Sequence, residues 1–187
     1  MRKVTYSMGT SLDGYIVGPD GGFNWSAPEP EVFRFSINEI QNIGVHLMGR
    51  KLYETMLYWE DPEQTPSFGE AECEWAALWN PLPKVVFSRT LSQVHGSARL
   101  ASGTLAEEIE RLRAEPGEGD IAIGGAELAA QAADLGLIDE YRVRVFPVLV
   151  GGGIPFFAHH ERRVDLELLE TRALSPTVVF YHYRVLR

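Results

Sequence analysis

Apolar and polar residues alternate with a period of two from residue 3 to residue 10, which predicts a β-strand. The two faces of this strand differ in kind, because one carries large apolar side chains and the other carries small ones. The small face is formed by Thr5, Ser7 and Gly9. The pattern therefore predicts a strand with one apolar face and one small, polar face.

Farther along, short apolar runs alternate with amphipathic segments, and this alternation predicts strands and helices in turn. The predicted strands cover residues 45–48, 84–88, 121–123, 141–150, 166–173 and 177–186. Helices are expected to begin near Glu31, Arg50, Glu70, Thr104 and Ala126. Glycines supply the expected stops of two of them, at Gly44 and Gly136, and a polar loop is expected over residues 60–69.

Strands and helices alternate as far as residue 135, and strands predominate after it. Such an order favours an α/β fold, a three-layer sandwich with a mostly parallel central sheet and antiparallel C-terminal edge strands. The chain has 187 residues, of which 45% are hydrophobic. We expect a single domain over residues 1–187.

Two glycines stand between the strand predicted at 121–123 and the helix that follows it. Gly124 and Gly125 leave no side chain in front of the helix, whose first N–H groups carry partial positive charge. A helix that begins at the carboxyl end of a parallel strand suits a phosphate. Taken alone, a Gly-Gly pair is more typical of a tight βα turn that binds no ligand.

A second junction places two cations in the first turn of a predicted helix, directly after Gly49. The helix dipole disfavours positive charge there, so Arg50 and Lys51 need an explanation. They form either a solvated pair that Glu54 partly offsets, or the site of a bound anion. This stretch alone does not decide between the two interpretations.

A third junction carries polar groups beyond the strand predicted at 84–88, namely Ser88, Arg89 and Thr90. In open α/β sheets, ligands bind beyond the carboxyl ends of the strands. The three junctions together predict a groove for a dinucleotide. Its pyrophosphate would lie at Gly124 and Gly125, with a further phosphate at the second junction.

Charge and cysteine content exclude several other functions. The net charge of −9 makes the chain a poor general binder of nucleic acid. Cys73 is the only cysteine, so an internal disulfide and a cysteine-rich zinc site are excluded. The adjacent residues His159, His160 and Glu161 lack a metal-binding spacing, and no metal is expected. No long apolar run or leader-like segment occurs, so we expect a cytoplasmic protein without a membrane span.

Several stretches resemble the dihydrofolate reductase fold, and within it the group that includes the reductase domain of bacterial riboflavin biosynthesis. The matching stretches are SLDGYI (Ser11 to Ile16), MGRKLYE (Met48 to Glu54), VVFSRTL (Val85 to Leu91), IAIGGAELA (Ile121 to Ala129) and IDEYRVRVFPVLVGGGIPFF (Ile138 to Phe157). They run over essentially the whole chain, and the last two are the most specific.

The resemblance implies a reductase that uses NADPH to transfer a hydride to a small heterocyclic substrate. The related activity is that of 5-amino-6-(5-phosphoribosylamino)uracil reductase. The positions that match the cofactor site of the family are Ile16, Gly49, Arg50, Lys51, Ser88, Arg89, Gly124, Gly125, Ala126, Glu127 and Leu128. Among these, the second junction is expected to meet the 2′-phosphate, the third to flank the adenine, and the double glycine to cradle the pyrophosphate.

Three departures from the family pattern leave alternatives open. Leu52 stands where the family often has threonine, and Pro30 and Glu31 stand near the acidic position of folate reductases. One cysteine cannot supply the zinc signature of a deaminase partner. The alternatives are a pterin reductase of the dihydrofolate reductase type, a non-catalytic nucleotide-binding protein, and a phosphate-binding protein unrelated to NADPH.

Asp13 and Glu31 are the candidate catalytic proton donors, although each also suits a structural role, in a turn and in the first turn of a helix. Trp25, Phe33 and Tyr53 are candidate walls of the substrate pocket, with core packing as the alternative. The expected partner is a small molecule. A valine-rich strand over residues 143–150 also favours a homodimer.

Overall fold

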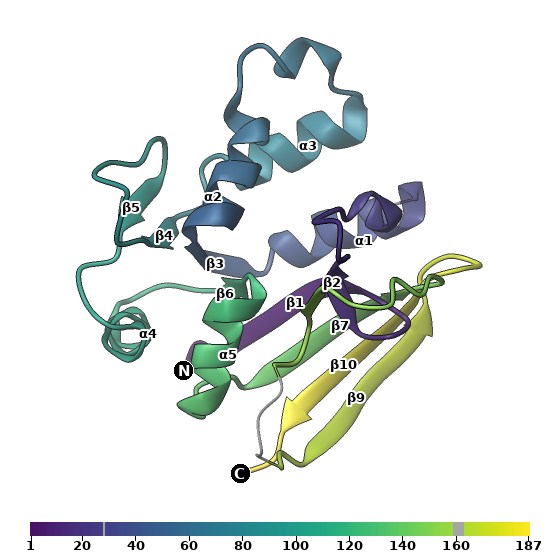
Figure 1. Cartoon of the computed structure of the whole chain (residues 1–187). Helices are drawn as coiled ribbons and strands as arrows, with labels where there is room; N and C mark the ends of the chain where they lie inside the picture. The colour runs from purple at the N-terminus through teal and green to yellow at the C-terminus, as the bar shows by residue number, and fades with distance from the viewer. Residues whose placement is uncertain (28, 159–162) are drawn as a thin grey trace.

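The structure is a computed structural model that describes residues 1–27, 29–158 and 163–187. An eight-stranded sheet forms the middle layer, in the order β5-β4-β3-β6-β1-β7-β10-β9 (Figure 1). Its strands are β1 (Val4–Ser11), β3 (Ile43–Gly49), β4 (Lys84–Phe87), β5 (Ala98–Leu100), β6 (Asp120–Gly124), β7 (Glu140–Phe146), β9 (Leu166–Ala173) and β10 (Val179–Val185). A separate pair joins β2 (Tyr15–Val17) and β8 (Ile154–Pro155).

Helices lie on both faces of the sheet. They are α1 (Pro30–Ile40), α2 (Arg50–Met56), α3 (Glu70–Trp79), α4 (Leu105–Ala114) and α5 (Ala126–Asp134), with short 3-10 turns η1 (Asn24–Ser26), η2 (Leu57–Glu60) and η3 (Thr65–Ser67). The strands from β5 to β7 pair in parallel, and β10 pairs antiparallel with both β7 and β9. The predicted fold class is confirmed.

The face of the sheet under α4 and α5 is apolar. Val4 and Tyr6 of β1 point into this layer, as the alternation along the strand predicted. They pack with Ile109 of α4 and Ala132 of α5, and all four are at most 1% exposed. Burying large aliphatic and aromatic side chains is the main source of the fold's stability.

The opposite face, under α1, is partly charged. Arg144 lies against Glu39 of α1 and also donates to the Ser7 hydroxyl at 3.2 Å. Arg142 donates to Asp120 and to Glu140, each at 3.0 Å. The two arginines are two residues apart in one strand and therefore lie on one face, but the sequence does not indicate these carboxylate partners.

Glu140 is the most enclosed acid of this charged face, with 1% of its side chain exposed. Burial alone would raise its pKa, but hydrogen bonds from Lys3, His182 and Arg142 outweigh that effect and lower the pKa to about 2. The His182 ring lies 2.7 Å from the carboxylate. Glu140 is therefore ionised at neutral pH and links β7 to His182 of β10 and to Lys3, just before β1.

Three details of the sequence prediction were wrong. Gly44 lies inside β3 rather than at the end of a helix, because α1 stops at Ile40. The strand predicted to reach residue 150 ends at Phe146, just before Pro147, which has no N–H for a ladder. The short strands β2, β5 and β8 went unpredicted, since two or three residues are too few to show a period.

The early end of β7 also removes the argument for a dimer through this strand. β7 is an internal strand between β1 and β10, so its backbone groups are already paired. In the part of the chain that the structure describes, no helix is long and apolar enough to cross a membrane. No metal-binding cluster occurs among the described residues, and His159, His160 and Glu161 lie outside them.

Candidate functional site

The three strand-to-helix junctions singled out from the sequence lie side by side. β3 stands between β4 and β6, and all three strands run parallel. Gly49 is in register with Phe87 on one side, and Met48 is in register with Gly124 on the other. The segments that follow the strands therefore leave the sheet at the same edge, as a dinucleotide groove requires.

The first turn of α5 is open. Gly125 is its N-terminal capping position and has a φ of 90°, which side chains rarely adopt. Among the residues that the structure describes, no side-chain cap is present at this turn. A Cβ added at Gly125 would meet no described atom within 4 Å, so the space beside this glycine is open. Backbone donors facing free space at a helix start suit an anionic group.

Gly124 is needed for a different reason, which is packing. A Cβ at this position would overlap Leu52 of α2 and His46 of β3. His46 lies edge-on to Trp79, with ring centroids 5.3 Å apart. Burial lowers the pKa of His46 to about 4, and Lys84 adds to the effect. The imidazole is therefore neutral at pH 7, and the lack of a side chain at Gly124 leaves room for it and for Leu52 of α2 beside β6.

The first turn of α2 also lacks a side-chain cap, at Gly49. Arg50 forms an ion pair with Glu54 at 3.2 Å, and 45% of each side chain is exposed. Lys51 is exposed as well. The structure thus contains the solvated pair that the sequence offered as one alternative. Because exposed pairs are weak, an incoming phosphate can compete with Glu54 for the guanidinium.

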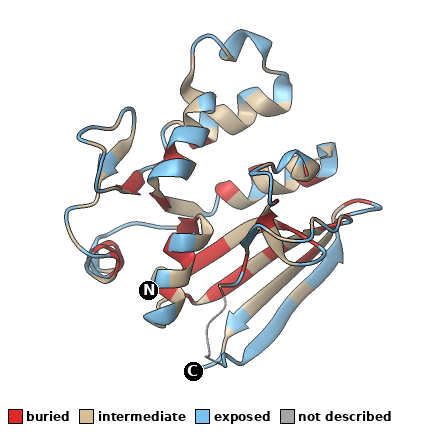
Figure 2. Ribbon diagram, viewed as in Figure 1, coloured by how far each residue is buried: buried red, intermediate tan, exposed pale blue. Residues whose placement is uncertain are grey.

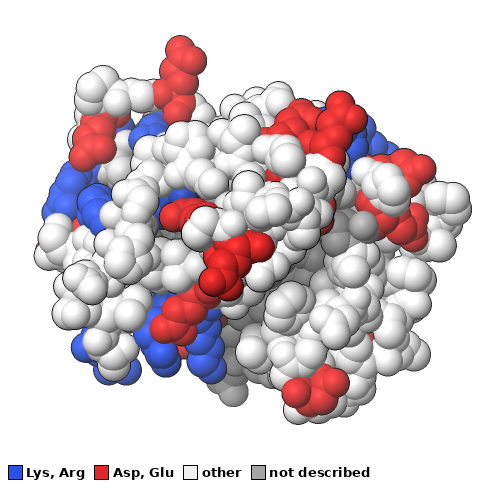
Figure 3. All heavy atoms as spheres, turned by 90° about the horizontal axis from the view of Figure 1, so that it is seen from above, with Lys and Arg blue, Asp and Glu red and all other residues white. Residues whose placement is uncertain are grey.

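At the third junction the Ser88 hydroxyl is already engaged. It accepts hydrogen bonds from the N–H groups of Thr90 at 3.2 Å and Leu91 at 3.0 Å, which shapes the turn after β4. Arg89 is exposed. In the view of Figure 3, blue side chains gather mainly in the left half, the side of α4, β4 and β5 in Figure 1, with red ones among them. Cations on this face are therefore local rather than a continuous basic surface.

Asp13 holds two loops together. Its carboxylate accepts hydrogen bonds from the N–H groups of Val150 at 3.1 Å and Gly151 at 2.7 Å. A hydrogen bond with Ser11, together with these two, lowers the pKa of the exposed carboxyl. Asp13 is thus an anion at neutral pH, which suits it to fasten the loop that precedes Ile16. Ile16 itself is 8% exposed, in β2.

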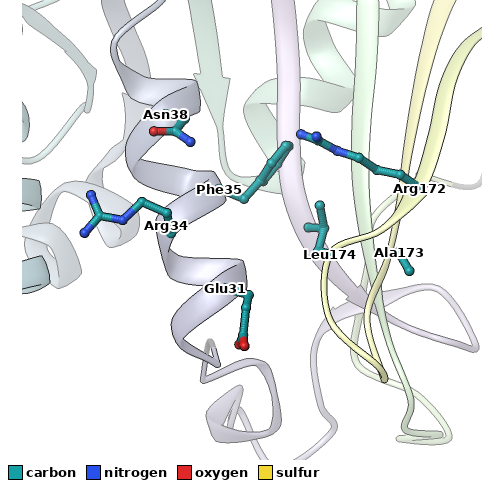
Figure 4. A pocket seen from close by; sticks show the side chains of 7 residues that line it. All are labelled: Glu31, Arg34, Phe35, Asn38, Arg172, Ala173 and Leu174. Atoms are coloured by element: carbon teal, nitrogen blue, oxygen red, sulfur yellow. The ribbon is translucent and has the colours of Figure 1, made fainter.

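Glu31 lies elsewhere, in the first turn of α1. It lines a shallow cavity of about 200 Å³ between α1 and the β9–β10 hairpin (Figure 4). The other lining residues are Arg34, Phe35, Asn38, Arg172, Ala173 and Leu174. Since β9 is four strands away from β6 in the sheet, the structure does not bring Glu31 to the open start of α5.

Glu29, just before α1, is an acid that the sequence analysis missed. It occupies the N-terminal capping position of the helix. Its carboxylate accepts a hydrogen bond from the Thr177 hydroxyl at 2.5 Å, and this contact with a further one from Ser175 lowers its pKa. Only its place before a proline that opens a helix could have drawn attention to it.

The three candidate aromatic residues have separate surroundings. Tyr53 is 4% exposed, and its hydroxyl accepts the N–H of His95 at 2.8 Å, so it belongs to the core. Phe33 lies against Trp59 and Trp75 between α1 and α3, with ring centroids about 6 Å apart. Trp25 packs edge-on against Phe146, which a Cβ at Gly9 would approach to 2.9 Å. They form no common pocket wall.

The small face of β1 lies on the α1 side of the sheet. Ser7 contacts Glu39 and Arg144, and Gly9 lies against Phe146. Glu39 and Arg144 form an ion pair here that the sequence analysis did not predict. The charged positions of β7 were visible in the sequence, but their pairing with α1 depends on tertiary packing.

Comparison with known proteins agrees with this architecture. The sequence model of the RibD C-terminal domain matches residues 2–180. The uncharacterized protein YyaP of Bacillus subtilis (strain 168) is 31% identical over 185 residues, which cover 97% of this chain and 95% of YyaP.

Two solved structures share the fold. A putative riboflavin biosynthesis protein from Shewanella sp. PV-4 superposes with a TM-score of 0.78 and 24% identity, over 100% of both chains. A diaminohydroxyphosphoribosylaminopyrimidine deaminase/5-amino-6-(5-phosphoribosylamino)uracil reductase from Thermotoga maritima gives a TM-score of 0.66 and 15% identity, over 99% of this chain and 57% of that one. These likenesses confirm the expected dihydrofolate reductase-like fold, and the match over residues 2–180 shows that the chain belongs to the RibD C-terminal domain family, a family of reductases.

Proposed function

We propose that this protein is an NADPH-dependent reductase that transfers a hydride to a small heterocyclic substrate of the pyrimidine or pterin kind. The observation that carries the proposal is the adjacency of two uncapped helix starts, at Gly49 and Gly125, with two exposed cations in one of them. Family membership supports the reductase class.

The residues present fit such a cofactor. The free space before Gly125 and the N–H groups of residues 126–128 suit a pyrophosphate, because the backbone donors there meet no side-chain cap. Arg50 and Lys51 suit the 2′-phosphate, which distinguishes NADPH from NADH. Exposed Arg89 lies at the adjoining junction and suits the adenine side.

When bound, the cofactor would supply the hydride, and the protein's own residues would bind and orient the reactants. Asp13 fastens the loop of Leu12 to Gly14 onto residues 150–151. Because its lowered pKa keeps it ionised, we assign Asp13 to positioning rather than to proton donation. Glu31 would donate a proton only to a substrate that reaches the cavity beside α1.

The test is a titration of the purified protein with NADPH and with NADH, followed by quenching of tryptophan fluorescence. The double variant Arg50→Ala/Lys51→Ala should bind NADPH about 10- to 100-fold more weakly, a loss of about 1.4–2.7 kcal/mol that matches one hydrogen bond to a charged group. NADH binding should change by less than about threefold.

A matched control removes two exposed, ion-paired arginines far from the groove, in the variant Arg163→Ala/Arg184→Ala. It should leave both affinities unchanged. Equal losses for NADPH and NADH in the groove variant would contradict the 2′-phosphate assignment. If the wild-type protein bound neither nucleotide, the cofactor proposal would be wrong.

Turnover separates the reductase from a non-catalytic nucleotide-binding protein. Oxidation of NADPH should be followed at 340 nm with aminopyrimidine phosphoribosides and with pterins as substrates. Consumption of NADPH with one of these classes and not the other identifies the substrate class. Tight NADPH binding without turnover on either class would favour the non-catalytic alternative.

A further inference from the structure

The order of the strands gives the proposed cofactor groove a direction. The 2′-phosphate is assigned to the start of α2, which follows β3, and the pyrophosphate to the start of α5, which follows β6. The next strands along the sheet are β1 and then β7 (Figure 1). Because neighbouring strands are about 5 Å apart, the hydride-carrying end of the cofactor, and with it the substrate, reaches the carboxyl ends of β1 and β7.

The carboxyl ends of β1 and β7 leave the sheet together. Ser11 and Phe146 are in register at the last residues of the two strands, and the Leu12 N–H then donates to the Val148 carbonyl at 2.8 Å. Both strands are largely buried, whereas the loops that follow them are mostly exposed or half-buried (Figure 2). Leu12 and Leu149 in these loops are 66% and 70% exposed. Exposed leucines at this place suit contact with a flat, apolar ring.

Two carboxylates lie in the same loops. Asp13 accepts the N–H groups of Val150 and Gly151, and its lowered pKa keeps it ionised at neutral pH. A Cβ added at Gly18 would lie 2.9 Å from the Asp20 carboxylate and 3.9 Å from the Val150 side chain. The two acids are therefore neighbours of Val150, and both are exposed. The end of β1 is thus apolar and negatively charged.

The two halves of the groove differ in charge. The half at β3 and β4 carries three exposed cations, Arg50, Lys51 and Arg89. Residues 11–33 and 145–158, which include the ends of β1 and β7 and the loops after them, contain acids but no lysine or arginine. A phosphate monoester carries about two negative charges at neutral pH and is bound by arginine, lysine or backbone donors. It suits the first half and is repelled by the carboxylates of the second.

One hydrogen-bond donor beside this end has no acceptor. Trp25 packs edge-on against Phe146, the last residue of β7, with ring centroids 6.1 Å apart. Its indole Nε1 is buried, and none of the described residues accepts a hydrogen bond from it. A buried donor without an acceptor is costly, and such a group in a native structure calls for an explanation. A carbonyl oxygen or ring nitrogen of a bound heterocycle would satisfy it.

Building on the function proposed above, we propose that the substrate is an uncharged planar heterocycle without a phosphate group, and that Trp25 donates a hydrogen bond to it. Leu12 and Leu149 cover the ring. The free heterocycle or its riboside is accepted, whereas Asp13 and Asp20 repel the phosphorylated form. One groove thus binds the phosphates of the cofactor and rejects a phosphate on the substrate.

Calorimetric titration with a matched pair of ligands tests the exclusion of phosphate. An aminopyrimidine riboside and its 5′-phosphate are titrated separately into the protein saturated with NADP⁺, so that no turnover occurs. The riboside should bind at least about 10-fold more tightly, since two carboxylates oppose the phosphate. Equal binding, or tighter binding of the 5′-phosphate, would overturn this inference and leave the cofactor proposal intact. A protein that binds neither NADPH nor NADP⁺ would refute both.

A charge-neutral variant assigns the exclusion to the acids. Asp20→Asn should narrow the difference between the two ligands about threefold, by removing one negative charge. Asp61→Asn is the matched control, because Asp61 makes the same turn contact as Asp20. Each accepts the N–H of the residue two positions ahead, at 2.8 Å and 2.9 Å respectively. Asp61 lies between η2 and η3, so its variant should leave the difference unchanged. Equal effects of the two variants would contradict the assignment.

The role of Trp25 is tested by removing its N–H while keeping an aromatic ring. Trp25→Phe should weaken riboside binding about 2- to 10-fold, as expected for one hydrogen bond, and leave the affinity for NADP⁺ unchanged. Unchanged NADP⁺ binding also shows that the variant folds. Trp75→Phe is the matched control, since Trp75 in α3 also has a buried Nε1 without an acceptor among the described residues. It should bind the riboside like the wild-type protein. Equal riboside affinities of the two variants would refute the role of Trp25.

Discussion

Helices α4 and α5 begin in opposite ways. Thr104 caps α4 by accepting the N–H of Glu107 at 3.3 Å, and Glu107 in turn accepts the N–H of Thr104 at 2.7 Å. The Glu108 carboxylate accepts a hydrogen bond from the N–H of Ser102, just before the helix, at 2.8 Å. At the start of α5, Gly125 offers no such acceptor.

The capped start of α4 contributes to stability, whereas the uncapped start of α5 suits the binding of a ligand. A side-chain cap contributes about 1 kcal/mol by satisfying N–H groups at a helix start. α4 has this contribution, because the Thr104 side chain occupies the N–H of Glu107. α5 forgoes the cap and keeps its donors free. Departures from local rules tend to mark functional positions, and the start of α5 is such a departure.

The largest effect should come from blocking the open start. In the variant Gly125→Val, a branched side chain would occupy the space in front of the N–H groups of α5, at a φ of 90°. NADPH binding, measured by fluorescence titration, should weaken about 100-fold or more. Loss of one or two hydrogen bonds to a charged group accounts for this factor.

The control for this variant lies at the other end of the same helix. Gly136 has a φ of 67°, so Gly136→Val imposes a comparable backbone strain away from the groove. Both variants should lose thermal stability, but only Gly125→Val should lose NADPH affinity. The groove assignment would be contradicted by two variants that lose affinity to the same extent.

Acid should lower the free energy of unfolding by protonating Glu108, near the start of α4. Burial opposes ionisation of Glu108, but hydrogen bonds from Arg99 and Ser102 outweigh it and lower its pKa to about 2. Because the folded-state pKa lies below the ordinary value of 4.5, the contribution is complete above pH 4.5 and is lost as the pH falls toward 2. Its size is on the order of 3 kcal/mol.

Urea unfolding at several pH values measures this contribution. Other acids, including Glu140, add to the slope of the wild-type protein, so the comparison is with Glu108→Gln. The variant should be less stable at pH 7 and should converge with the wild-type protein near pH 2. Curves that stay parallel from pH 7 to pH 2 would show that Glu108 contributes nothing through its charge.

The two helix starts also show which features of the structure the sequence could predict. The capping box of α4 and the glycines of α5 are local signals, so both helix starts were predicted within a residue. The carboxyl ends of β3, β4 and β6 were expected to lie at one edge of the sheet, because parallel strands all end on the same side. By contrast, the pairing of Glu39 with Arg144, the role of Asp13 and the place of Glu31 depend on residues far apart in the chain. No periodicity encodes such contacts.

Removing the cap of α4 should affect stability alone. Thr104→Ala should lower the free energy of unfolding by about 1 kcal/mol, as measured in urea, and leave NADPH affinity unchanged. Thr55→Ala is the matched control, because its exposed hydroxyl donates to the Lys51 carbonyl within α2 and caps nothing. That control should be neutral or slightly stabilising. An effect of Thr104→Ala on NADPH affinity would argue against the division between the two helix starts.

The smallest expected effect concerns α2, whose start lacks a side-chain cap, as does that of α5. Glu54 occupies the guanidinium of Arg50 at 3.2 Å, and a phosphate would have to displace it. Glu54→Gln should therefore tighten NADPH binding about two- to threefold, since exposed ion pairs contribute up to about 1 kcal/mol. NADH has no 2′-phosphate, so its affinity should not change. If NADPH bound more weakly to the variant, Glu54 would be orienting Arg50 for the phosphate instead of competing with it.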